Sequence, residues 1–173
     1  AKKYFAEAEG LARSLGDGIA EGYLGLFVVR CDERSLPANQ KLQDVDRLAQ
    51  EYLLVAQKFQ AGGHRSGEAY ARAQVGKLYE SIGSLTKARD EYRQAIEVEE
   101  TTLGEFLVPM YHYQYQEILN LEQERSGSYA QLASLLIQMK GKEEALSVLD
   151  LGSQRSQAKL LEDVSIAIRH PSL

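Results

Sequence analysis

The stretch EAYARAQVGKLYESIGSLTKARDEYRQAI, residues Glu68–Ile96, decides the fold of this chain. Gly76 and Ala88 lack bulk, so two antiparallel helices can approach each other closely at these positions. Tyr79 and Tyr92 are large enough to fill the space on either side. Apolar and small residues recur at helical spacing through both halves of the stretch. The sequence therefore predicts two packed helices, over residues 66–82 and 85–100.

The same stretch resembles one tetratricopeptide repeat (TPR), a helix pair of about 34 residues. Arg72 stands where the family has Trp, and Glu100 stands where a closing Pro is often found. The resemblance implies an all-α fold, a right-handed α-solenoid of antiparallel helix pairs, whose inner face is lined mainly by the first helix of each pair. The resemblance is carried by apolar, small and aromatic residues at fixed spacing: Val75, Gly76, Tyr79, Ala88, Tyr92 and Ala95.

Echoes of this pattern occur elsewhere in the chain. Leu24-Gly25-x2-Val28 repeats the first-helix spacing, and Ala49, Leu53 and Ala56 repeat the second-helix spacing. Ala1 begins another second-helix pattern, so we expect the chain to be a fragment of a longer solenoid. One TPR-like array over residues 1–173 is predicted. Its elements are a first helix over 1–14, helix pairs over about 19–60, 66–100 and 128–153, an irregular long helix over 104–125, and a final helix over 155–168.

The segments between these helices carry their own signals. Gly16 is expected to end the first helix, and Asp17 is expected to cap the second. The polar residues 31–40, which contain Pro37, are expected to form a loop inserted within a helix pair. This loop is either functional or a tolerated surface insertion. His64 follows two glycines, so we expect it to lie in a turn with its side chain in solvent.

Composition and charge exclude several classes of protein. The net charge of −5 argues against a general nucleic-acid binder, which normally carries a basic excess. No apolar run reaches the roughly 18–20 residues that span a bilayer, so no membrane insertion is expected. Cys31 is the single cysteine and has no partner for an internal disulfide. A reducing compartment, the cytoplasm, is therefore predicted.

No motif predicts catalysis or a cofactor. Gly16-Asp17-Gly18 lacks both the spacing of a phosphate-binding loop and its following Lys. Cys31 has no His nearby in the sequence, and His112 has no companion at metal-ligand spacing. The carboxylates are spread along predicted solvated helix faces. We therefore expect a protein that is not an enzyme and that holds no metal and no cofactor.

Candidate partner-binding residues lie on the first helix of each pair, turned away from the packed stripe. Their Tyr, Gln, Lys and Arg side chains suit an extended peptide or a partner helix, because Gln can bond a peptide backbone and the cations can meet an acidic group. These residues are Tyr23, Arg30, Tyr70, Gln74, Lys77 and Gln131. Tyr111 and Tyr115 form an aromatic stripe that is either core packing or a partner contact. The predicted function is a protein–protein interaction module.

A second resemblance suggests an alternative function. Residues 143–164 are similar to repeats in proteins that join tetratricopeptide repeats to a caspase-like CHAT protease domain. The resemblance implies a regulatory arm that packs on a catalytic domain outside these 173 residues. The residues that match the CHAT-linked repeats are Glu143, Glu144, Ala145, Leu146, Asp150, Gly152, Arg155, Leu160 and Leu161.

A peptide-sensing transcription regulator is a third possible function.

Overall fold

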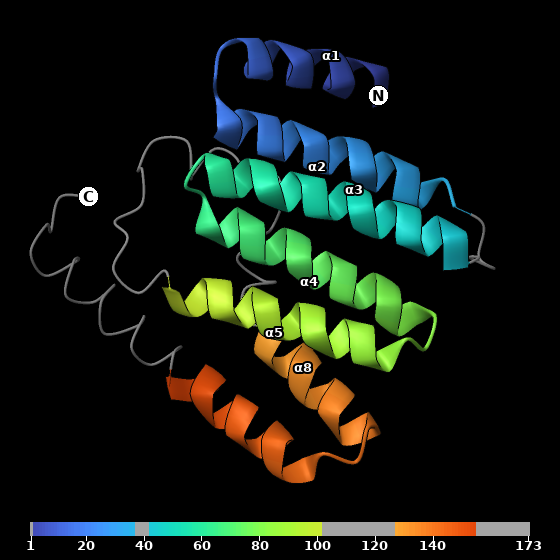
Figure 1. The fold of residues 1–173 in the computed structure, drawn as a ribbon, viewed down its shortest axis with the longest axis vertical. Helices are drawn as coiled ribbons and strands as arrows, with labels where there is room; N and C mark the ends of the chain where they lie inside the picture. The colour runs from blue at the N-terminus through green and yellow to red at the C-terminus, as the bar shows by residue number, and fades with distance from the viewer. Residues whose placement is uncertain (1, 37–41, 102–126, 155–173) are drawn as a thin grey trace, which may run out of the picture. The chain divides into compact units, whose positions relative to one another are not determined.

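The computed structural model describes residues 2–36, 42–101 and 127–154, and these residues form only helices and turns (Figure 1). The predicted all-α class is confirmed for this part of the chain. Contacts divide the chain into two compact units, Ala1–Arg125 and Ser126–Leu173. The helices predicted over 104–125 and 155–168 lie outside the described residues. The prediction of one array over residues 1–173 stays a prediction.

The first unit is a succession of five described helices. Each helix packs against the next one along the chain, and α2 also contacts α4. Short turns reverse the chain between α1 and α2, between α3 and α4, and between α4 and α5, as Figure 1 shows. The helices are α1 (Lys2–Ser14), α2 (Gly18–Arg34), α3 (Leu42–Ala61), α4 (Arg65–Ser81) and α5 (Leu85–Thr101).

The prediction that a polar loop begins at residue 31 is wrong, because α2 continues to Arg34. Neighbouring helices hold the polar side chains of this last turn. Lys2 of α1 donates to Asp32 at 2.6 Å. The Tyr52 hydroxyl of α3 donates to Glu33, also at 2.6 Å. These contacts come from residues far away in sequence, so the local pattern could not reveal them.

The turn between α1 and α2 confirms the predicted caps. Gly16 has a φ of +71°, the left-handed conformation that glycine adopts without steric strain. The Asp17 N–H donates back to the Ala12 carbonyl at 3.0 Å, which satisfies a carbonyl at the end of α1. The Asp17 side chain then accepts from the Ala20 N–H at 2.9 Å and caps α2. Two glycines at the later turns, Gly63 and Gly83, have nearly the same φ.

Close contact between a glycine and an aromatic ring joins α4 to α5. Tyr92 of α5 is fully buried against Gly76 of α4. A Cβ atom added at Gly76 would lie only 2.6 Å from Tyr92 Cε1. The Tyr92 hydroxyl donates to Glu80 at 2.9 Å, so the buried phenol keeps a hydrogen bond. The close approach that was predicted at Gly76 and Tyr92 is confirmed.

A similar contact between a glycine and an aromatic ring joins α2 to α3. Phe59 is fully buried, and a Cβ atom added at Gly22 would lie 2.6 Å from Phe59 Cδ1. A Cβ atom added at Gly67 of α4 would meet the same ring at 2.6 Å. Gly22 with Phe59 is thus the tight glycine–aromatic contact between α2 and α3, and a Cβ atom added at Gly25 would meet Val55 of α3 at 3.2 Å. The Phe59 ring fits between α2 and α4 because both helices have a glycine, Gly22 and Gly67, where they face it.

The second unit contains α8 (Gly127–Gln138) followed by helical residues 142–154. Tyr129 is buried, and a Cβ atom added at Gly152 would lie 2.9 Å from the Tyr129 Cβ atom. Lys140 stands in the turn between the helices with a φ of +66°, where the turns of the first unit have glycine. Ala133 of α8 and Ala145 of the following helix are buried.

Candidate partner-binding surface

Two of the predicted partner-binding residues meet between α2 and α4. Arg30 lies near the end of α2, and Tyr70 lies in the second turn of α4, 40 residues further along the chain. The Arg30 guanidinium donates to the Tyr70 hydroxyl. Its Cζ atom also lies 5.3 Å from the centre of the Tyr70 ring, within the range of a cation–π contact. The two helices that were expected to line one surface therefore bring these side chains together.

Tyr52 and Glu33 complete this group, which we call the Arg30 cluster (Arg30, Glu33, Tyr52 and Tyr70). Tyr52 of α3 is fully buried, and its hydroxyl donates to Glu33 Oε2 at 2.6 Å. Burial raises the pKa of Tyr52 well above its usual value, and the hydrogen bond to Glu33 adds to this increase, whereas the positive charge of Arg30 opposes it. Tyr52 is thus a neutral donor that holds the Glu33 carboxylate.

The charge of Arg30 has no partner carboxylate among the described residues. Arg30 is half-buried, and within the described parts of the chain no carboxylate lies within 4.0 Å of its guanidinium. Other partly buried arginines of the first unit do form ion pairs. They are Arg65 with Glu68 at 3.0 Å, Arg72 with Glu68 at 3.5 Å and Arg89 with Asp90 at 2.9 Å.

Tyr23 does not have the exposure that a lining residue needs. Its side chain is fully buried. Its ring packs edge-on against Phe59 with the ring centres 5.0 Å apart, and its hydroxyl lies 3.1 Å from His64 Nε2. The physical reason is the register of α2, in which Gly22 meets Phe59 and carries the next residue into the core. Tyr23 is therefore a core residue.

The other predicted lining residues differ in exposure. Tyr70 and Gln74 are 7% and 9% exposed, and Lys77 is half-buried. Gln131 belongs to the second unit and is half-buried on α8. Tyr111 and Tyr115 lie outside the described residues. Arg30 and Lys77 are thus the more exposed candidates on α2 and α4, whereas Tyr70 and Gln74 reach the surface only slightly, and the binding role of all four stays a prediction.

His64 is a helix cap, which sequence reasoning missed. Its Nδ1 atom accepts a hydrogen bond from the Gly67 N–H at 2.9 Å, so it begins α4 in the way that Ser or Asp usually begins a helix. Since Nδ1 accepts, the proton of the neutral ring sits on Nε2, next to the Tyr23 hydroxyl. His is not among the residue types that commonly cap helices, so the sequence did not indicate that His64 begins α4.

Arg72 makes a charged contact between α4 and α5. Its guanidinium donates to Gln94 of α5 at 2.6 Å and lies 3.9 Å from Glu91. On its own helix it pairs with Glu68, whose side chain is only 2% exposed. Burial raises the pKa of Glu91, and the charge of Arg72 opposes this shift. Arg72 therefore joins α4 and α5 through polar and ionic contacts.

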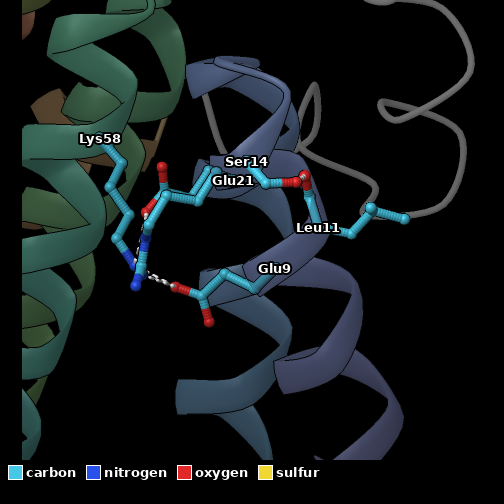
Figure 2. Close-up of polar contacts among 6 residues, drawn as sticks. Glu9, Leu11, Ser14, Glu21 and Lys58 are labelled. Carbon is cyan, nitrogen blue, oxygen red and sulfur yellow. Dashed lines mark hydrogen bonds and ion pairs between the residues drawn. The ribbon is translucent and has the colours of Figure 1, made fainter.

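A second group of charges, the Lys58 cluster (Glu9, Arg13, Glu21 and Lys58), joins the first three helices. Lys58 of α3 pairs with Glu9 of α1, as Figure 2 shows, and lies 3.7 Å from Glu21 of α2. Arg13 donates to Glu21 at 2.9 Å and lies 3.5 Å from Glu9. Two cations and two carboxylates therefore neutralise one another within the cluster.

The described residues offer no sign of a metal centre or a membrane span. Within these ranges no three or more His, Cys, Asp or Glu side chains gather where they could hold a metal ion. No described helix is both long enough and apolar enough to cross a bilayer. Cys31 on α2 is a free, half-buried thiol.

Comparison with known proteins gives no relative. No protein-family model matches the chain, and no curated protein or solved structure matches it either. The class that can be stated for the described residues is all-helical, and in this part of the chain Arg30 and Tyr70 link α2 to α4, two helices that are not consecutive in the sequence. The resemblances to tetratricopeptide repeats and to CHAT-linked repeats stay predictions, and residues 155–164 of the second one lie outside the described parts.

Proposed function

We propose that this chain is a non-catalytic protein–protein interaction module, a TPR-like right-handed α-solenoid that binds a peptide or protein segment on its concave face. The similar packing of two helix pairs supports the solenoid. In α2–α3 and in α4–α5, an aromatic ring of the second helix lies against a glycine of the first. The additional contact between α2 and α4 is the one expected where first helices of adjacent pairs line a common face.

The contact between Arg30 and Tyr70 is the observation that carries the binding proposal. It brings a cation of α2 to a phenol of α4, on the helices that line the proposed face. Gln74 and Lys77 follow Tyr70 at intervals of four and three residues, so they stand on the same side of α4. Such a row of guanidinium, amide and ammonium groups suits the carbonyls and acidic groups of an extended peptide.

The rest of the proposal follows from the sequence. The module acts without a cofactor, and its partner is a protein or a peptide. We assign it to the cytoplasm because Cys31, the single cysteine, has no internal partner for a disulfide.

Selection of short random peptides displayed on phage tests the function. The immobilised 173-residue chain is expected to enrich a defined set of peptides. These peptides should lose most of their affinity for Lys77→Glu, which reverses a charge on the proposed face. They should bind Lys3→Glu normally, because the Lys3 side chain is 83% exposed on α1, a helix outside that face. Failure to enrich any peptide, or equal binding to both variants, would refute the proposal.

A further inference from the structure

We propose that Arg30 is the anchor for a carboxylate of the bound peptide, with Tyr70 and Tyr52 as positioning residues that prepare it. This inference rests on the proposed function, because it names the chemistry of the ligand at the same surface. It goes beyond that function by assigning one side chain to one chemical group.

The charge distribution is the first argument. Partial withdrawal of a cation from water is unfavourable unless an opposite charge compensates it. Arg65 and Arg72, both partly buried, share the carboxylate of Glu68. Lys58 has Glu9 and Glu21. Arg30 is half-buried, and no carboxylate of the described residues compensates it, so an incoming anion gains the interaction that the other cations already have.

The geometry of the guanidinium is the second argument. Arginine carries five N–H donors in a rigid planar fork that matches both oxygens of a carboxylate. In the described part of the chain, Arg30 uses Nη2 toward the Tyr70 hydroxyl. Contact with the face of the Tyr70 ring restrains the guanidinium further. Its remaining donors are therefore held in position before a ligand arrives, which lowers the entropy lost on binding.

The position of Glu33 is the third argument. Glu33 lies three residues after Arg30 on α2, where an ion pair along the helix would be possible. Its Oε2 atom instead accepts from the buried Tyr52 hydroxyl at 2.6 Å, and no ion pair joins it to Arg30. Tyr52 thereby keeps the internal carboxylate away from the anchor.

Synthetic peptides taken from the phage selection test the anchor. We expect an Asp or Glu at one fixed position in the enriched sequences. Fluorescence anisotropy then measures the Kd of one such peptide for the wild-type chain, Arg30→Gln and Arg34→Gln. Arg30→Gln should weaken binding about tenfold or more, as expected for a charged bidentate contact. Arg34→Gln is the matched control, because Arg34 is an exposed arginine on the same helix, and its Kd should change less than about twofold.

A double-mutant cycle separates the anchor from an indirect effect. Replacing the acidic residue of the peptide by its amide should weaken binding to the wild-type chain by the same factor. It should have no further effect on Arg30→Gln. Arg30→Lys, which keeps the charge but loses the fork, should fall between the two. Peptides with an amidated C-terminus distinguish an internal acidic side chain from a terminal carboxylate as the group that is held.

The outcomes distinguish this inference from the function on which it rests. Enriched peptides without a carboxylate requirement, bound equally by Arg30→Gln, would overturn the anchor and leave the binding function intact. Additive effects in the cycle would also overturn it, since Arg30 would then act on binding through the fold alone. The absence of any enriched peptide would remove the function and the anchor together. Thermal melts of each variant verify that the chain remains folded.

Discussion

The Lys58 cluster and the Arg30 cluster both connect successive helices through charged side chains, and they differ in how complete they are. In the Lys58 cluster, Glu9 and Glu21 face Lys58 and Arg13, so each charge has an opposite partner (Figure 2). In the Arg30 cluster, the cation meets a phenol, and the neighbouring carboxylate is held by another phenol. The first cluster is satisfied internally, which suits a structural role, whereas the second retains binding capacity, which suits a role in recognition.

The largest expected effect concerns α2, the helix that both clusters share. Gly22→Ala should lower the free energy of unfolding by about 1–3 kcal/mol, because the added Cβ atom would meet the Phe59 ring at 2.6 Å. Gly10→Ala is the matched control, since a Cβ atom there has no neighbour within 4 Å. It should raise the stability by up to about 1 kcal/mol through helix propensity. Chemical denaturation measures both, and equal effects would mean that α2 and α3 do not meet at Gly22.

Tyr52→Phe should have the next largest effect, because it opens the Arg30 cluster. Loss of the buried hydrogen bond to the Glu33 carboxylate should lower stability by about 1–2 kcal/mol. The released carboxylate can then turn toward Arg30, so affinity for an acidic peptide should also fall. Denaturation and anisotropy measure the two effects on one variant. A stability loss with unchanged affinity would show that Tyr52 does not keep Glu33 away from the anchor.

Lys58→Met should produce a smaller loss, about 1 kcal/mol, because it leaves Glu9 and Glu21 with Arg13 alone. The flexible apolar side chain retains most of the packing of the lysine stem. Lys3→Met, at an 83% exposed position, should change stability by less than about 0.5 kcal/mol. If thermal melts showed the same shift for both variants, the Lys58 cluster would contribute no more than an ordinary surface pair.

Arg30→Gln should have the smallest effect on stability, a loss below about 1 kcal/mol, because it removes the hydrogen bond and the cation–π contact with Tyr70 but no ion pair with a described carboxylate. The comparison between the clusters predicts different consequences. Lys58→Met lowers stability and leaves peptide affinity unchanged, whereas Arg30→Gln lowers peptide affinity strongly and stability only slightly. A large loss of stability in Arg30→Gln would assign Arg30 to the structural frame of the protein.

Local signals in the sequence predicted a substantial part of the fold. Gly16 and Asp17 indicate the end of α1 and the start of α2, because glycine favours the left-handed conformation at a helix end and aspartate favours the N-cap position. Gly76 and Tyr92 indicate the close contact of α4 with α5, because both belong to the continuous patterned stretch 68–96. In these cases the residues that decide the structure are near one another in the chain.

The predictions that were wrong depended on contacts between distant residues. The last turn of α2 carries polar residues that Lys2 and Tyr52 hold from other helices. The pairing of Gly22 with Phe59 follows from a packing choice among several small residues, which spacing alone leaves open. The contact of Arg30 with Tyr70 crosses from α2 to α4, so the sequence supplied both residues as candidates without indicating that they meet.

NMR mapping of a selected peptide onto the chain tests whether the peptide binds at the Arg30 cluster. Amide chemical shifts of the isotope-labelled 173-residue chain are followed as the peptide is added, together with the side-chain Nε–H signals of its arginines. The account predicts that the largest changes lie on α2 and α4 around Arg30, Tyr70 and Lys77, and that the Arg30 side-chain signal moves while that of Arg13 does not. Changes confined to other helices, with the Arg30 signal unmoved, would contradict it.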